Sequence, residues 1–213
     1  MSPNPLRTFW NRKADRVFRE GGWGPLQSWP VAREGKDPLV FQMRLPLTME
    51  LIDMGTLAAN SPGAPESVQQ GALEIAQVAS VGGLILTGAL RETKPETPPE
   101  ILATMTVALS DIAGPPVVDE HVGADSADDV RPPEVVKLSD RATRITRLQR
   151  VLPPDGDELS PLLTVQYLIQ SRYGAVAWVY ATTVPGMIFG EGGRDLFAKI
   201  TEGGYIGERP QTY

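Results

Sequence analysis

Two segments near the C-terminus carry side chains that alternate with the period of a β-strand. The first segment is Leu162–Ser171, and its large residues at every second position are Val165, Tyr167 and Ile169. The second segment is Ala175–Thr183, where the same positions hold Val176, Trp178 and Tyr180. The link Ser171–Gly174 between them is short enough for a tight antiparallel turn. Because this pattern buries one face of each strand, it predicts an antiparallel sheet with one packed face.

Further strand candidates are bounded by turn residues. They are Leu39–Leu45, Leu84–Arg91, Glu134–Leu138 and Thr143–Leu152. The segment Ile101–Ser110 carries two conflicting signals. Its alternation is typical of a strand, while Thr97–Glu100 has the form of a helix capping box with proline at the first helical position. We favour the strand, because a preceding strand joined through a Pro-rich loop predicts a hairpin.

Two main helices are predicted, at about 65–79 and at 190–202, and the second has Leu196, Phe197 and Ile200 as its buried stripe. Residues 47–59 are ambiguous, and the tail Tyr205–Tyr213 is expected to be irregular. The expected fold class is therefore α+β. It consists of a mostly antiparallel sheet of about six strands covered by two helices, with an N-terminal helical arm.

The N-terminal arm differs from the rest of the chain in charge and composition. Helical spacing relates its apolar residues Leu6, Phe9, Trp10, Ala14, Val17 and Phe18, and two glycines end the pattern. Residues 1–20 hold five basic and two acidic side chains, which is a net charge of +3. The whole chain carries -6, so the other 193 residues carry -9. A Gly/Pro-rich strap with Trp23 and Trp29 follows and is predicted to be irregular. We divide the chain into an arm, 1–35, and one α+β sandwich domain, 36–213.

Composition excludes several classes of protein. The absence of cysteine excludes a disulfide framework, an iron–sulfur site and the usual structural zinc site. No run approaches about 18 uninterrupted apolar residues, so no membrane span is expected. Basic residues interrupt Leu6–Phe18, which predicts no secretion signal and a cytoplasmic location. An acidic body repels nucleic acid, and no nucleic-acid partner is expected.

The motifs that resemble reactive sites are all weak. His121, the only histidine, lies in an acidic loop at 114–133 and is interpreted as solvated. Gly190–Gly193 precedes a helix but matches neither a P-loop nor a dinucleotide motif. Asp125–Asp129 and Asp155–Glu158 lack calcium-loop spacing and are interpreted as exposed turns. We therefore predict no catalytic residue, no metal site and no cofactor.

Residues 39–202 resemble the PsbP-like α/β/α sandwich of small actinobacterial proteins. The residues that carry the resemblance are FQMRLP at Phe41–Pro46, where a strand ends in a prolyl turn, the paired strands LILTGAL and ILATMTVALSDI, the run Val135–Val151, and Thr164–Phe197, which has Val-Gln-Tyr near its start and closes with a helix that contains phenylalanine. The resemblance implies an adaptor, an assembly factor or a binding module. It implies no shared catalytic residue.

The expected function is that of a non-catalytic protein-interaction or assembly component, which engages a neighbouring subunit through its arm and belongs to an oligomer or larger assembly. The predicted partner-binding residues are Phe9, Trp10, Arg12, Arg16, Phe18, Arg19, Trp23 and Trp29, because aromatic and arginine side chains dominate interface energetics. The arm also fits docking on its own domain, on an anionic membrane or on nucleic acid.

Two alternative functions come from different classes. The first is a small-ligand or lipid-binding module, with a pocket between sheet and helices lined by Tyr167, Trp178 and Tyr180. The second is a hydrolase or transferase with a divergent site, which requires a convergent polar cluster in a cleft.

Overall fold

The computed structural model describes residues 22–53, 83–93, 100–110, 128–152 and 157–211, and two antiparallel sheets contain most of these residues. Seven strands form the larger sheet of this described part, in the order β3-β4-β5-β9-β8-β7-β6. They are β3 (Met49–Asp53), β4 (Leu84–Glu92), β5 (Glu100–Ser110), β6 (Glu134–Ser139), β7 (Ala142–Val151), β8 (Ser160–Ser171) and β9 (Gly174–Thr182).

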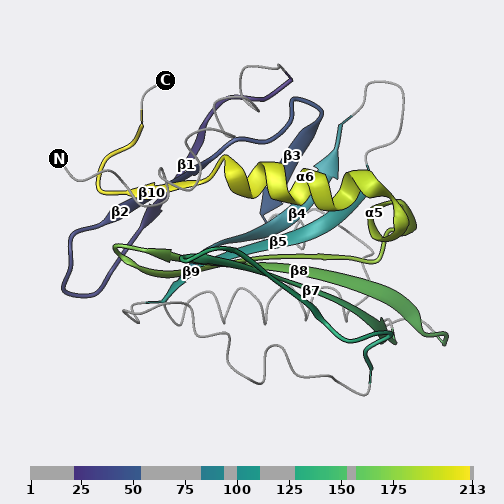
Figure 1. The fold of residues 1–213 in the computed structure, drawn as a ribbon. Coiled ribbons are helices and arrows are strands. Elements are labelled where there is room, and N and C mark those ends of the chain that lie inside the picture. The colour runs from purple at the N-terminus through teal and green to yellow at the C-terminus, as the bar shows by residue number, and fades with distance from the viewer. Residues whose placement is uncertain (1–21, 54–82, 94–99, 111–127, 153–156, 212–213) are drawn as a thin grey trace.

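The smaller sheet has the order β1-β2-β10. Its strands are β1 (Gln27–Val31), β2 (Leu39–Met43) and β10 (Tyr205–Gly207). Between β9 and β10 lie the helices α5 (Pro185–Phe189) and α6 (Glu191–Glu202). Figure 1 shows both helices and the smaller sheet on the same side of the larger sheet. The expected α+β class is confirmed.

The predicted hairpins are present. β8 pairs with β9 from Leu163↔Thr182 to Ser171↔Gly174, where Gly174 has φ 137°, a value that favours glycine. The predicted hairpin β4–β5 is also antiparallel, and so are the pairs β6–β7 and β7–β8. The ambiguous segment 101–110 is strand β5, as favoured, and lies between β4 and β9.

One face of the larger sheet forms the core of the molecule. Its buried side chains come from alternate positions on β5, β8 and β9, and they are Ala103, Met105, Val107, Leu109, Leu163, Val165, Tyr167, Ile169, Val176, Trp178 and Tyr180. The helix α6 packs on this face through Phe197 and Ile200, each 0% exposed, and ends at Gly203, as predicted. Burying such a side chain contributes about 1.5–3 kcal/mol.

Three details of the prediction were wrong. The strand number is larger, because the sheets have seven and three strands in the described residues rather than about six together. Trp29 and Pro30, expected in an irregular strap, lie in β1, where proline is tolerated because β1 is an edge strand. Residues 205–207, expected in an irregular tail, form β10 against β2.

Several predicted segments lie outside the described residues. They are the helix at 65–79, the arm helix within 1–20 and most of the acidic loop with His121. β1, counted with the arm at 1–35, is hydrogen-bonded to β2 of the sandwich domain. No described helix has both the length and the apolar character needed to span a membrane.

Candidate functional site

Two of the predicted partner-binding residues lie in the described part of the chain. The half-buried indole of Trp29 is tilted over the ring of Phe41, with centroids 5.8 Å apart. Trp23 forms an isolated bridge with Pro46 and packs partly on the core. Both indoles therefore contact the core of their own chain. The remaining predicted anchors, Phe9, Trp10, Arg12, Arg16, Phe18 and Arg19, lie outside the described residues.

A continuous row of aromatic rings joins the two sheets and α6. Phe41 meets the indole of Trp178 edge-on at 5.3 Å, and Trp178 is stacked near Tyr180 at 6.2 Å. Tyr180 stacks on Phe197 of α6 with centroids 4.3 Å apart. Its hydroxyl hydrogen-bonds Thr201, whose own hydroxyl lies 2.8 Å from the Phe197 carbonyl. Burial raises the pKa of Tyr180 well above its usual value, and the Thr201 hydrogen bond opposes this only in part.

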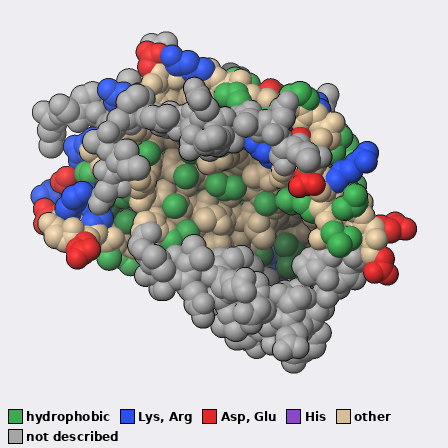
Figure 2. All heavy atoms as spheres, turned by 90° about the horizontal axis from the view of Figure 1, so that it is seen from below, with side chains coloured by type: hydrophobic (Ala, Val, Ile, Leu, Met, Phe, Trp, Pro, Cys, Tyr) green, Lys and Arg blue, Asp and Glu red, His purple; other side chains and the backbone are tan. Residues whose placement is uncertain are grey.

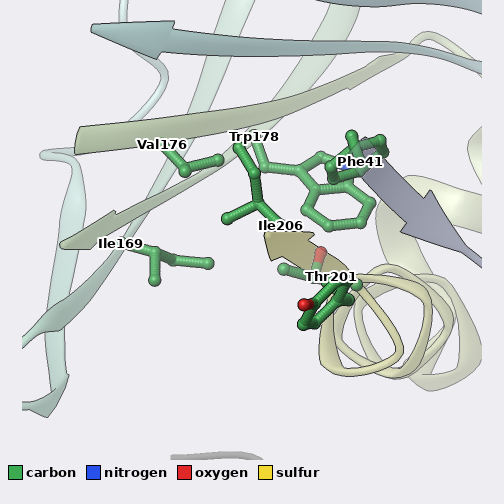
Figure 3. A pocket seen from close by; sticks show the side chains of 8 residues that line it. Phe41, Ile169, Val176, Trp178, Thr201 and Ile206 are labelled. Carbon is green, nitrogen blue, oxygen red and sulfur yellow. The ribbon is translucent and has the colours of Figure 1, made fainter. Parts of the chain in front are cut away.

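The space beside this row is too small for an organic ligand. Figure 3 shows it between β8–β9 and the C-terminal end of α6, with Val176 and Ile169 on one side and Thr201 and Ile206 on the other. The cavity volume is about 10 Å³, which is room for one water molecule. Trp178 lines this space, whereas Tyr167 and Tyr180 meet edge to face at 6.3 Å. The three side chains expected to line a ligand pocket are thus core residues.

A row of partly exposed charged side chains lies beside the same face, between β6, β7 and α6. Arg144 of β7 is 3.1 Å from Glu134 of β6, and Arg194 of α6 reaches the other oxygen of that carboxylate at 3.8 Å. Opposite Arg144 in the ladder is Tyr167, which is 3% exposed. Burial raises the pKa of Tyr167 to about 12, although the charge of Arg144 acts in the opposite direction.

A polar hollow lies on the opposite face of the larger sheet, which Figure 2 shows from below. It has a volume of about 190 Å³ and is lined by Ile145, Arg147, Gln149, Thr164 and Gln166 of β7 and β8. The two amides and the hydroxyl can donate and accept hydrogen bonds.

Arg147 at the wall of the hollow is 3.2 Å from Asp129, whose side chain is 3% exposed. The interpretation of Asp125–Asp129 as an exposed turn was therefore wrong for Asp129. The reason is a contact between residues far apart in the sequence. Asp129 forms an isolated β-bridge with Gln149 of β7, and this bridge places the Asp129 carboxylate beside Arg147. Residues 125–127 lie outside the described part.

An apolar surface at one end of the molecule was missed by the sequence analysis. Phe189 at the end of α5 is 71% exposed, and Leu152 and Leu159 are each 61% exposed. The two leucines come one residue beyond Val151↔Ser160, the last pair of the β7–β8 ladder. α5 begins shortly after β9 and contacts β8. Figure 1 shows α5 and the tip of the β7–β8 hairpin toward the same end of the molecule, at the right of the view. We call Leu152, Leu159 and Phe189 the apolar end.

Acidic residues adjoin the apolar end. Asp157 and Glu158 precede Leu159 and are exposed. Figure 2 shows hydrophobic side chains among charged ones at the corresponding edge of the molecule. The sequence did carry a signal for this surface, because Leu152 and Leu159 flank a stretch rich in Pro, Asp and Gly. The position of Phe189 depended on α5, which the sequence analysis did not predict.

Comparisons with known proteins give only distant likenesses. No protein-family model matches the sequence, and no curated protein matches it. The cyanobacterial PsbP (CyanoP) of Synechocystis sp. PCC 6803 aligns at 16% identity and a TM-score of 0.43, covering 88% of this chain and 96% of that chain.

Two further solved structures align over similar lengths. LpqN of Mycobacterium tuberculosis, involved in cell envelope biogenesis, aligns at 16% identity and a TM-score of 0.41, covering 91% of this chain and 96% of that chain. The Ran-binding protein Mog1p of Saccharomyces cerevisiae aligns at 10% identity and a TM-score of 0.39, covering 85% and 96%. The resemblance to PsbP-like proteins that the sequence suggested is thus matched by a PsbP structure, while a relation to actinobacterial proteins in particular stays a prediction. At these TM-scores, function has to be argued from the residues of this chain.

Proposed function

We propose that the protein is a non-catalytic interaction or assembly component that engages a neighbouring subunit through its N-terminal arm. The observation that carries this proposal is the apolar end. Single exposed apolar residues are ordinary on protein surfaces, whereas several large ones at one end of a molecule favour an interaction site. Phe189, Leu152 and Leu159 are each more than half exposed. They belong to α5 and to the tip of the β7–β8 hairpin, which lie toward the same end of the fold.

The energy available from this surface suits association. Fully burying a leucine or phenylalanine contributes about 1.5–3 kcal/mol, so covering three partly exposed side chains offers several kcal/mol before ordering costs are subtracted. The composition of the arm supports the same function. Its aromatic residues and five basic side chains precede a body of charge -9, and opposite charges steer association and fix register.

The experiment measures the mass of the full-length chain by light scattering over a range of concentrations. The expected result is a mass above 23.1 kDa that rises with concentration. The variant Phe9→Ser/Trp10→Ser, in the full-length chain, is expected to return the mass to that of the monomer. Full-length variants are preferred to a deletion of 1–35, because such a deletion also removes β1.

Leu138→Ser is the matched control, because Leu138 is an exposed apolar residue on β6 away from the apolar end. It is expected to leave the mass unchanged. A wild-type chain that stays monomeric at every concentration contradicts self-association. The cytoplasmic location stays a prediction.

A further inference from the structure

We propose that the apolar end of one copy binds the N-terminal segment 6–18 of a second copy, so that molecules associate head to tail. This inference rests on the proposed function and adds the surface that receives the arm. The apolar end carries large side chains that are exposed at 61–71%. The segment offers Phe9, Trp10 and Phe18 as a complementary apolar stripe at helical spacing.

Charge complementarity supports this choice of partner. Exposed Asp157 and Glu158 lie next to Leu159 at the apolar end. The arm carries Arg12 and Arg16 beside its aromatic residues. A basic aromatic segment therefore meets both requirements of the surface, since it can cover the leucines and Phe189 while placing guanidinium groups near the carboxylates.

The two surfaces differ from each other, which decides the type of assembly. An interface between unlike patches is heterologous and yields rings or open chains rather than a closed symmetric dimer. Each copy then donates one arm and receives one. Added salt is expected to weaken the contact, because its rim is ionic and exposed.

The first experiment uses full-length variants of each surface. Leu159→Ser/Phe189→Ser and, separately, Asp157→Lys/Glu158→Lys are both expected to reduce the mass measured by light scattering to that of the monomer. The charge control is Asp140→Lys. The Asp140 side chain is 97% exposed and lies beyond the Ala142 end of β7, which is nine residues along the strand from Val151. At about 3.3 Å per residue, this places the control roughly 30 Å from the apolar end.

A mixing experiment tests the head-to-tail arrangement. The arm variant Phe9→Ser/Trp10→Ser keeps an intact apolar end, and Leu159→Ser/Phe189→Ser keeps an intact arm. Each variant alone is expected to be monomeric, and an equimolar mixture is expected to form a dimer that grows no further. Circular dichroism of each variant confirms that it is folded before mixing.

The outcomes separate the inference from the proposed function. If the arm variant dissociates while both apolar-end variants remain assembled, the arm binds elsewhere and the inference is wrong, although the proposed function stands. If the apolar-end variants dissociate and the arm variant does not, the occupant is another surface and the inference is again wrong. If the mixture of folded variants stays monomeric, head-to-tail docking is excluded. A wild-type monomer at all concentrations contradicts both proposals.

Discussion

Gly204 stands so close to Trp178 that a β-carbon on the glycine would lie 2.3 Å from Cζ3 of the indole. The indole is 2% exposed and is held between Phe41 and Tyr180. Gly204 follows the C-cap of α6 and precedes β10, so this contact fixes where the chain passes from the helix to the smaller sheet.

We expect Gly204→Ala to lower the free energy of unfolding by about 1–3 kcal/mol, because the packed indole has no room to move aside. Gly192→Ala is the matched control. A β-carbon there meets nothing within 4 Å in the first turn of α6, and alanine favours a helix by up to about 1 kcal/mol. Urea unfolding of both variants checks the pair. Equal stabilities would contradict the close contact.

Thr201 and Tyr180 form a buried hydroxyl pair at 2.9 Å. Thr201→Val leaves the phenol without its partner, and we expect the free energy of unfolding to fall by about 1–3 kcal/mol. The double variant Thr201→Val/Tyr180→Phe removes both polar groups and is expected to lose less than the sum of the two single variants. A double-mutant cycle in urea measures this coupling, and strictly additive losses would show that the hydroxyls do not interact.

The sequence was sufficient to predict the elements that depend on local signals. The alternation around Tyr167 and Trp178, with a turn between, predicted β8, β9 and their pairing. Gly203 correctly marked the end of α6. In each case the residues that decide the structure are close together in the sequence, so periodicity and turn chemistry are enough.

The second sheet was not predictable in this way, because it depends on distant pairing. β10 exists because Tyr205 pairs with Gln42, from the opposite end of the chain. Trp29–Pro30 lies in a strand because β2 pairs with one edge of β1. The other edge of β1 has no partner strand among the described residues, so the N–H group that proline lacks is not needed there. Alternation tells which face of a strand is buried but not which strand lies beside it. The same limit explains why the apolar end was missed, since it is assembled from α5 and the β7–β8 tip.

Two ion pairs differ in burial and are expected to differ in energy. The Asp129 side chain beside Arg147 is 3% exposed, whereas Glu50 and Arg91 on β3 and β4 are 42% and 36% exposed. Asp129→Asn is expected to cost about 1–3 kcal/mol, because it removes the negative charge from a mostly buried ion pair. Glu50→Gln is expected to cost at most about 1 kcal/mol. Thermal unfolding at low and high salt tests the contrast, and a larger loss from Glu50→Gln would refute it.

Tyr167 predicts how stability changes at alkaline pH. Burial raises its pKa from 10.0 to about 12, against the opposing charge of Arg144. Between these values the unfolded chain releases the phenol proton while the folded chain keeps it. The contribution of Tyr167 to stability is therefore complete below pH 10 and is lost as the pH rises through 12, by roughly 2–3 kcal/mol in all. Tyr167→Phe removes the titrating group, so its unfolding free energy is expected to fall less steeply above pH 10. Urea titrations at several alkaline pH values compare the two slopes, and parallel slopes would mean that Tyr167 is not linked to folding.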